Sequence, residues 1–367
     1  MKLESGKITP AQLMFAAACF IQASSLLSAF LVGVTAADSW FAVILGILCC
    51  VPLLMIYIGL LKLFPGKNLV EINRLAYGKI IGPVASLLQI VFILTLASLN
   101  LRDLDVFVKQ TIMDKTPDIV LMLCCILVSA LAIHYGIEVV LRYGFMFILL
   151  SGFVLLISLL LAANQMDFNN FLPMLQMPPI KYVQGANIAL SIPFGELFVF
   201  LMIAPYVHEK KRKFGRYFIG GFLLGGILFL LVVFRDTAVL GNTIGLFALP
   251  AFETLRLVSL LGAISRMEIL FATVLIALLF FKVSVLYYAA VLAIAQIFNM
   301  KSYRPIILVT GILIIGYSFT LYPSNVQHAN SGRETSTILW QLFETVIPFF
   351  ALILGAVKKK IRKEVQA

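Results

Sequence analysis

One apolar stretch, residues 187–206 (NIALSIPFGELFVFLMIAPY), constrains the fold more than any other part of the sequence. About 20 residues at a rise of about 1.5 Å each are enough to span a membrane as a helix. Yet Pro193, Gly195 and Glu196 lie at its centre, where a helix loses a backbone donor and where an ionisable group is costly. Such a break is tolerated only where protein or a water-filled cavity satisfies the freed backbone groups. The stretch therefore indicates a discontinuous transmembrane helix that lines a binding site. The alternative is a proline kink with Glu196 hydrogen-bonded inside a helix bundle.

The composition places the whole chain in the membrane class. Of 367 residues, 62% are hydrophobic and only 12% are charged, against about 25% charged in soluble domains. We therefore predict an all-α polytopic membrane protein with ten transmembrane helices. The predicted spans cover residues 10–33, 40–61, 83–108, 118–133, 143–163, 185–207, 217–240, 268–298, 305–322 and 339–357. An even number of spans places both termini on the same side of the membrane.

The distribution of basic residues predicts which side that is. With the N-terminus inside, 19 of the 28 lysines and arginines fall in inner segments and seven in outer segments, so both termini are expected in the cytoplasm. The net charge of +11 is then explained by membrane orientation and by attraction to anionic lipid, and no nucleic-acid partner is expected. The basic run at residues 209–216 is interpreted as a solvated inner flank, with a docking surface for a cytoplasmic partner as the alternative.

The first predicted span is also interrupted by polar residues. Gln22, Ser24 and Ser25 lie at its centre, where they either bond across a helix interface or mark a second break. The first and sixth spans are five apart and so enter the membrane from opposite sides. This pattern predicts two inverted five-helix repeats, at about 8–165 and 180–358, with broken helices 1 and 6 and a ligand site between them. The chain, residues 1–367, is expected to be a single transporter-like domain.

Depth in the membrane groups the candidate ligand-binding residues. Glu196 and Lys282 are the only opposite charges expected at mid-depth, and a lone buried charge costs several kcal/mol, so we predict that they pair. Near the outer face, Arg102 and Asp105 have the spacing of a local ion pair. The predicted ligand site lies at mid-membrane between the first, third, sixth and eighth spans. Its complete set of residues is Gln22, Ser24, Ser25, Thr95, Ser98, Ser191, Pro193, Gly195, Glu196, Lys282 and Ser284.

Signatures of soluble catalysis are missing from the sequence. It contains no glycine-rich phosphate loop, no cluster with metal-ligand spacing and no nucleophile elbow, so we predict no enzyme activity, no cofactor and no metal site. Two outer segments are not simple turns. Residues 244–262 are predicted to form an amphipathic surface helix with Leu255, Val258 and Leu261 on one side. Residues 322–337 are polar and predict a loop that could act as a lid.

An ordered set of short sequence words resembles the B subunit of the endospore germinant receptors, a branch of the amino acid–polyamine–organocation transporter superfamily. The resemblance covers nearly the whole length, and no single word is diagnostic. The words are Lys7-Ile8-Thr9 with Gln12; FPGKNLVEI at 64–72; Gly78-Lys79 with Gly82; NLRDLDVFVKQTIMDKTP at 100–117; GIEVVLR at 136–142; NFLPML at 170–175; PFGE at 193–196; FFKVSVLYYAA at 280–290; and Tyr322-Pro323.

This resemblance implies a receptor in the inner membrane of the dormant spore. It would bind a small nutrient germinant, commonly an amino acid, together with a larger membrane A subunit and a lipoprotein C subunit. The sequence departs from the family at residues 22–27, where glycine is usual and none is present. Either this helix is unwound less, or serine side chains satisfy its backbone. The ammonium of Lys282 could take the role that a coupling sodium ion has in related transporters.

Three functions agree with these features. The first is a ligand-gated receptor subunit with a transporter fold, which the resemblance favours. The second is an amino acid or polyamine permease coupled to protons through Glu196. The third is a water or ion pathway lined by the mid-depth polar groups. Topology alone does not separate them, because one fold serves several functions.

Overall fold

The computed structural model describes residues 7–207, 214–260 and 267–364. These residues form helices, and their only β pairing is an isolated parallel bridge between Ile8 and Val207. The all-α prediction is confirmed. The α-helices are α1 (Pro10–Ala23), α2 (Ser28–Thr35), α3 (Ser39–Leu63), α4 (Leu69–Thr111), α5 (Asp118–His134), α6 (Ile137–Ala162), α7 (Pro179–Ala189), α8 (Phe200–Ile203), α9 (Phe214–Leu240), α10 (Pro250–Leu260), α11 (Met267–Ile297), α12 (Ile307–Thr320), α13 (Asn325–Glu334), α14 (Ser336–Gln341) and α15 (Ile347–Glu364).

Two of the sequence words that carry the family resemblance are helix starts. Thr9 caps α1, and its side chain and that of Gln12 each accept a hydrogen bond from the other residue's backbone N–H. Asn68 and Glu71 form the same reciprocal arrangement at the start of α4. A capping box satisfies backbone donors that the first turn of a helix leaves free. These words therefore fix where two helices begin.

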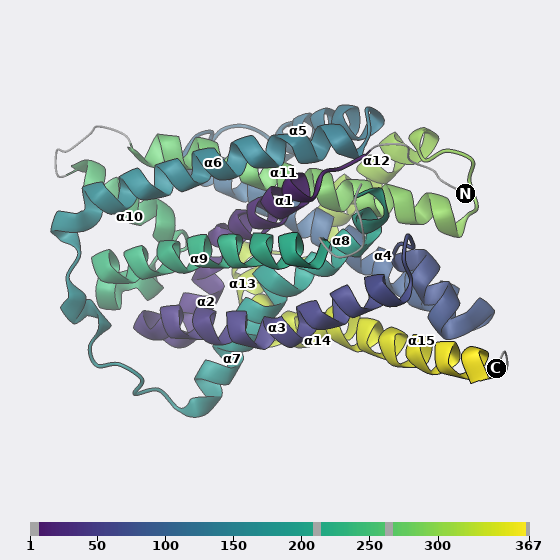
Figure 1. Ribbon diagram of the computed structural model, residues 1–367. Coiled ribbons are helices and arrows are strands. Elements are labelled where there is room, and N and C mark those ends of the chain that lie inside the picture. The colour runs from purple at the N-terminus through teal and green to yellow at the C-terminus, as the bar shows by residue number, and fades with distance from the viewer. Residues whose placement is uncertain (1–6, 208–213, 261–266, 365–367) are drawn as a thin grey trace.

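The long helices lie side by side, with α1 in the interior of the bundle (Figure 1). α1 packs against α6, α9 and α11, while α4 packs against α11, α12 and α15. The side chains of α1 from Ala16 to Ala23 are almost fully buried, and most of them are small. Small residues let neighbouring helices approach closely in a membrane bundle. This packing brings the middle of α1 against the middle of α11.

Fewer helical stretches than the ten predicted spans are long and apolar enough to cross a membrane by themselves. Among the described residues, seven stretches can cross a membrane, or eight when α12 and α13 are counted as one bent span. One of the seven, Pro10–Leu63, contains two predicted spans, which are divided at Ala36 by a positive φ of 44°. The helix α5 is apolar, but with 17 residues it is shorter than these spanning stretches. The count of ten and the repeat boundaries remain predictions.

The segments that were predicted to be cytoplasmic gather at one end of the bundle. Pro179–Tyr206 corresponds to the sixth predicted span and is called the sixth stretch; residues 10–35 contain the first predicted span and are called the first stretch. Ile8, before α1, donates a backbone hydrogen bond of 3.0 Å to the carbonyl oxygen of Tyr206 at the end of the sixth stretch. In α15, the ammonium of Lys358 donates to the carbonyl oxygen of Ala76, 2.8 Å away. The beginning of α1 and the end of α15 thus lie toward the same end of the molecule (Figure 1). This agrees with an even number of spans.

One of the two outer segments differs from its prediction. Residues 322–337 were predicted to form a loop, but they contain the helix α13, which is capped by the hydroxyl of Ser324. The prediction was wrong because the polar composition of this segment reflects exposure and not irregular backbone. Within residues 244–262, α10 is a helix as predicted, with Leu255 fully buried. Leu261 and Gly262 lie outside the described residues, as do residues 209–213 of the basic run.

Candidate functional site

Both predicted helix breaks are present. In the sixth stretch, α7 ends at Ala189 and is followed by a π-helical turn, Leu190–Phe194, and a 3₁₀-helical turn, Gly195–Val199. Pro193 lies inside the π turn, where its missing N–H interrupts the regular hydrogen-bond ladder. All residues of the two turns except Leu190 are buried, so protein surrounds the interruption, as a break within the membrane requires.

The break in the first stretch is milder. The helix α1 passes into a 3₁₀-helical turn, Ser24–Leu27, and continues as α2. Ser24 keeps right-handed helical angles (φ −75°, ψ −1°). A 3₁₀ turn shifts the hydrogen-bond pattern by one residue without freeing a long run of backbone. Of the two alternatives that follow from the missing glycines, the structure therefore favours weaker unwinding.

An ion pair joins the sixth stretch to α11, beside the break in the first stretch. The Nζ atom of Lys282 lies 2.6 Å from Oε2 of Glu196, and both side chains are almost completely buried. The same ammonium donates to the hydroxyl of Ser24 at 2.7 Å and lies 4.9 Å from the centre of the Phe20 ring. The predicted pairing of Glu196 with Lys282 is confirmed. The ammonium of Lys282 contacts a carboxylate, a hydroxyl and an aromatic face, each of which stabilises a buried cation.

A second buried carboxylate, Glu344, lies against the broken sixth stretch. Glu344 belongs to the π turn Leu342–Val346, and neither of its carboxylate oxygens has a hydrogen-bond partner among the residues that the structure describes. A Cβ atom placed on Gly195 would come within 2.3 Å of Oε2 of Glu344. The hydroxyl of Tyr57 lies 2.8 Å from the carbonyl oxygen of Glu344 and 3.1 Å from that of Gly195. The sequence left Glu344 outside the candidate set, although an acidic residue in an apolar span is itself a signal of function.

The remaining predicted site residues divide into two groups. Gln22, Ser25 and Ser98 are buried and each retains a side-chain oxygen without a hydrogen-bond partner. The others are engaged elsewhere. Thr95 bonds to the hydroxyl of Tyr317, and Ser284 to that of Ser129, on sides of the bundle away from the ion pair. Ser191 donates to the carbonyl oxygen of Thr337 and accepts from Gln341. Depth alone grouped these residues; it does not show which way each helix face points.

One of the seven basic residues that the sequence analysis assigned to outer segments is Arg235, and this assignment was wrong. Its side chain is fully buried within α9. It forms an ion pair with Asp236 at 2.6 Å and donates to the hydroxyl of Ser158 at 2.7 Å. Together with Gln22 and Ser25 it lines a cavity of about 10 Å³, room for about one water molecule. The adjacent Arg-Asp pair inside an apolar stretch could have indicated a buried charge.

The side of the site that is predicted to face outward is covered by α13. The guanidinium of Arg333 donates to the carbonyl oxygen of Ala29 in α2 at 3.2 Å, and His328 lies 3.4 Å from the carboxylate of Asp103 in α4. The ring of His328 also stacks on Tyr322, with the ring centres 4.9 Å apart. The predicted pair of Arg102 and Asp105 is present at 3.7 Å, and Arg102 also contacts Asp118 at 2.9 Å. These contacts connect α13 to α2 and to α4, and connect α4 to the start of α5.

Solved structures show which class of protein has this arrangement. The fold is similar to that of solved membrane transporters. The crystal structure of MhsT in complex with L-phenylalanine covers 95% of this chain and 99% of its own, with a TM-score of 0.66 at 13% identity. Mhp1, a nucleobase-cation-symport-1 family transporter in a closed conformation, covers 94% of this chain and 78% of its own, with a TM-score of 0.64 at 14% identity. At this identity the likeness establishes the fold alone.

Sequence comparison identifies the family. The family model described as "Spore germination protein" matches residues 7–328, and the chain belongs to that family. Spore germination protein KB of Bacillus subtilis (strain 168) is 27% identical over 341 residues, with 89% of each chain covered. Spore germination protein A2 of the same organism is 27% identical over 334 residues, with 88% of each chain covered. The resemblance inferred from the short sequence words is thereby confirmed.

Proposed function

We propose that this chain is a B-type subunit of a nutrient germinant receptor in the inner membrane of the dormant spore. In this proposal a small ligand such as an amino acid binds at mid-membrane and triggers germination. The observation that carries the proposal is the fully buried ion pair of Glu196 and Lys282 at the junction of the two broken helices. Membership of the spore germination family and the transporter fold support it.

The ion pair suggests how an amino acid would be recognised. A zwitterion placed between the two groups would present its ammonium to Glu196 and its carboxylate to Lys282, so that every buried charge keeps an opposite partner. The hydroxyl of Ser24 accepts a hydrogen bond from Lys282 at this position, and its own proton would be donated to the carboxylate of the ligand. Exchange of one buried pair for two avoids the several kcal/mol that an unpaired buried charge costs. Ligand entry would separate Glu196 from Lys282 and thereby shift the broken sixth stretch relative to α11.

The receptor would not need to transport its ligand. It would act with a larger membrane A subunit and a lipoprotein C subunit, and the change at the ion pair would be passed to these partners. Because Lys282 supplies a fixed positive charge beside Ser24, ligand binding should not require sodium. The second candidate, an amino acid or polyamine permease coupled to protons through Glu196, is favoured by one observation, the similarity to MhsT, which was solved with L-phenylalanine.

Ligand binding to the purified protein tests the proposal. Labelled amino acids would be measured in sodium-free and sodium-containing buffer, with wild type, Glu196→Gln and Glu138→Gln in parallel. Glu138 is a partly exposed carboxylate at the start of α6, so its amide variant is a matched control. We expect saturable binding that does not depend on sodium, that is lost in Glu196→Gln and that is kept in Glu138→Gln.

Two results would contradict this function. Equal binding by wild type and Glu196→Gln would place the ligand site away from the ion pair. Accumulation of the bound amino acid inside reconstituted vesicles under a proton gradient, without any partner subunit, would support the permease instead. The vesicle assay therefore separates the two candidate functions once a ligand is found.

A further inference from the structure

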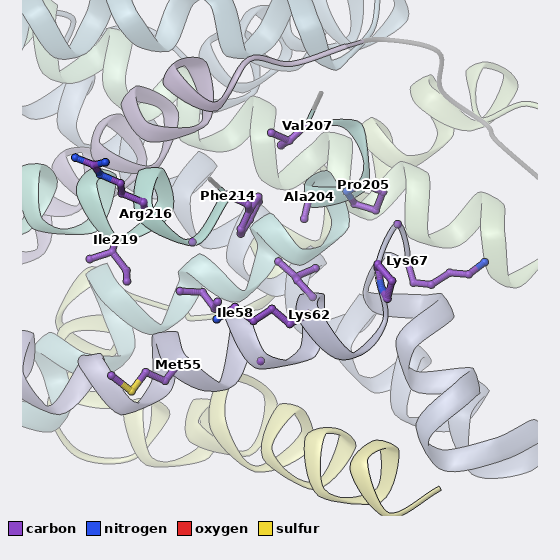
Figure 2. Close-up of a pocket in the computed structure, with 15 residues that line it drawn as sticks. Met55, Ile58, Lys62, Lys67, Ala204, Pro205, Val207, Phe214, Arg216 and Ile219 are labelled. Carbon is purple, nitrogen blue, oxygen red and sulfur yellow. The ribbon is translucent and has the colours of Figure 1, made fainter. Parts of the chain in front are cut away.

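A large pocket lies at the inner end of the bundle, away from the ion pair. It is a cavity of about 940 Å³ between the end of α3, the end of the sixth stretch and the beginning of α9. Figure 2 shows Met55, Ile58 and Lys62 of α3 across from Phe214 and Ile219 of α9, with Ala204, Pro205 and Val207 along a third side. Arg216 also lines the pocket, and in this view its guanidinium extends away from α3. A volume near 1,000 Å³ is at the upper end of the range for small-molecule sites.

The charge of the pocket has one sign. Three basic residues, Lys62, Lys67 and Arg216, line it, and no acidic side chain does so among the residues that the structure describes. Lys67 is partly engaged, since its ammonium lies 2.8 Å from Glu71. Lys62 and Arg216 have exposed side chains on α3 and α9, respectively. The described part of the pocket is therefore suited to an anionic group.

The pocket also has an apolar wall that continues along the outer faces of two helices. On α3, Leu48 is 61% exposed and Met55 64%, and on α9, Ile219 is 38% and Leu223 44% exposed. In a chain of this composition, apolar side chains exposed on spanning helices face lipid. We call the exposed apolar surface formed by Leu48, Met55, Ile219 and Leu223 the apolar lane. With basic residues at one end and the apolar lane at the other, the pocket matches a molecule that has a charged head and a hydrocarbon tail.

We propose that this pocket binds an anionic phospholipid of the inner leaflet. The phosphate would lie beside Lys62, the exposed side chain of Arg216 would turn toward the acidic headgroup, and an acyl chain would run along Met55 and Ile219 toward the membrane centre. Basic pockets between transmembrane helices on the cytoplasmic side recognise anionic headgroups in this way. Because α3 and the end of the sixth stretch both line the pocket, the bound lipid would contact α3 and the broken helix at the same time. An acidic protein segment would use the cations but not the apolar lane, so the lining favours lipid.

The test is lipid binding to the purified full-length protein, measured by native mass spectrometry in mild detergent. The probes are phosphatidylglycerol and phosphatidylcholine with the same acyl chains. Wild type should bind phosphatidylglycerol in preference to phosphatidylcholine. The variant Lys62→Gln/Arg216→Gln should lose about tenfold of that preference, because each basic residue near an anionic headgroup contributes to binding.

The matched control carries the same change in charge elsewhere on the inner face. Lys301→Gln/Arg304→Gln alters two exposed basic residues of the segment between α11 and α12, which does not line the pocket. It should keep the wild-type preference. A third variant, Ile219→Trp, should weaken phosphatidylglycerol binding by filling the apolar lane while keeping every charge. Size-exclusion profiles and melting temperatures of all variants establish that each is folded.

Three outcomes would overturn the proposal. Unchanged lipid preference in Lys62→Gln/Arg216→Gln would show that the pocket does not recognise the headgroup. An equal loss in the Lys301→Gln/Arg304→Gln control would assign the preference to the overall positive charge. Displacement of phosphatidylglycerol by an acidic peptide at equal concentration would indicate a protein-docking surface.

Discussion

At the residue scale, the most constrained group is Lys282. It is fully buried in α11, and its ammonium contacts the carboxylate of Glu196, the hydroxyl of Ser24 and the ring of Phe20. Burial of a charge pair is nearly neutral for stability when the pair is intact, but removal of one partner leaves an uncompensated charge. The pair is therefore a better indicator of function than of stability. Single and double mutations distinguish the cost of one lone buried charge from the net contribution of the intact pair.

We predict strong coupling between the two members of the pair. Glu196→Gln and Lys282→Met should each destabilise the protein by about 3–5 kcal/mol, because each leaves one buried charge without a partner. The double variant should be clearly more stable than the less stable single variant, because no lone charge remains. Melting temperatures in detergent provide the measurement. A double variant no more stable than the worse single one would remove the support for the pairing.

An exposed ion pair provides the reference for this comparison of single and double variants. Arg142 and Glu138 lie four residues apart on α6, 3.2 Å from each other, with both side chains substantially exposed. Replacing them with glutamine singly and together should change stability by only about 0.5 kcal/mol or less. A coupling in this pair as large as that of the buried one would show that the assay does not report on burial.

At the element scale, the two breaks are built differently. The sixth stretch passes through a π turn and then a 3₁₀ turn around Pro193, whereas the first has a single 3₁₀ turn and no glycine. The sixth stretch is also held from outside, since Tyr57 of α3 bonds to the carbonyl oxygens of both Gly195 and Glu344. The hydroxyl of Tyr57 thus connects α3 to the 3₁₀ turn Gly195–Val199 and to the π turn Leu342–Val346. The sixth stretch is therefore the more irregular of the two, and its break is fixed in position by α3.

A pair of glycine substitutions tests how closely the sixth stretch is packed. Gly195→Ala places a Cβ atom 2.3 Å from the carboxylate of Glu344 and 3.0 Å from the carbonyl oxygen of Leu190. It should destabilise the protein by about 1–3 kcal/mol, as overpacking of a close contact does. Gly152→Ala in α6, where nothing lies within 4 Å, should be neutral or stabilising. Equal melting temperatures for the two variants would contradict the close contact at Gly195.

At the scale of the whole molecule, orientation in the membrane remains a prediction. The positive-inside count favours cytoplasmic termini, and the described inner segments gather at one end of the bundle (Figure 1). Lys301 follows α11 and Val326 lies in α13, so α12 separates them along the membrane normal. Both residues have exposed side chains.

Cysteine labelling in intact cells tests this orientation. With a membrane-impermeant maleimide, Val326→Cys should react from outside, whereas Lys301→Cys should react only after permeabilisation. The native cysteines lie in apolar helices, and the unsubstituted protein measures their background labelling. The reverse pattern of labelling would mean that the N- and C-termini lie outside and would remove the basis for an inner-leaflet lipid site.

Local chemistry determined much of this protein from the sequence alone. The apolar composition required membrane-spanning helices, Pro193 required an interruption, and two lone charges at one depth, Glu196 and Lys282, required each other. The structure bears out all three. These features are readable because each depends on a cost that water-free surroundings impose on a particular residue.

Tertiary structure alone decided how each helix is rotated about its axis. Depth grouped Thr95 and Ser284 with the site, but their helices turn them toward Tyr317 and Ser129. It also decided that Glu344 rests on Gly195 and that the polar segment after Tyr322 is the helix α13. Hydropathy reports how far along the membrane normal a residue lies. Its direction within the membrane plane depends on packing between segments far apart in the chain, and only the folded bundle specifies that packing.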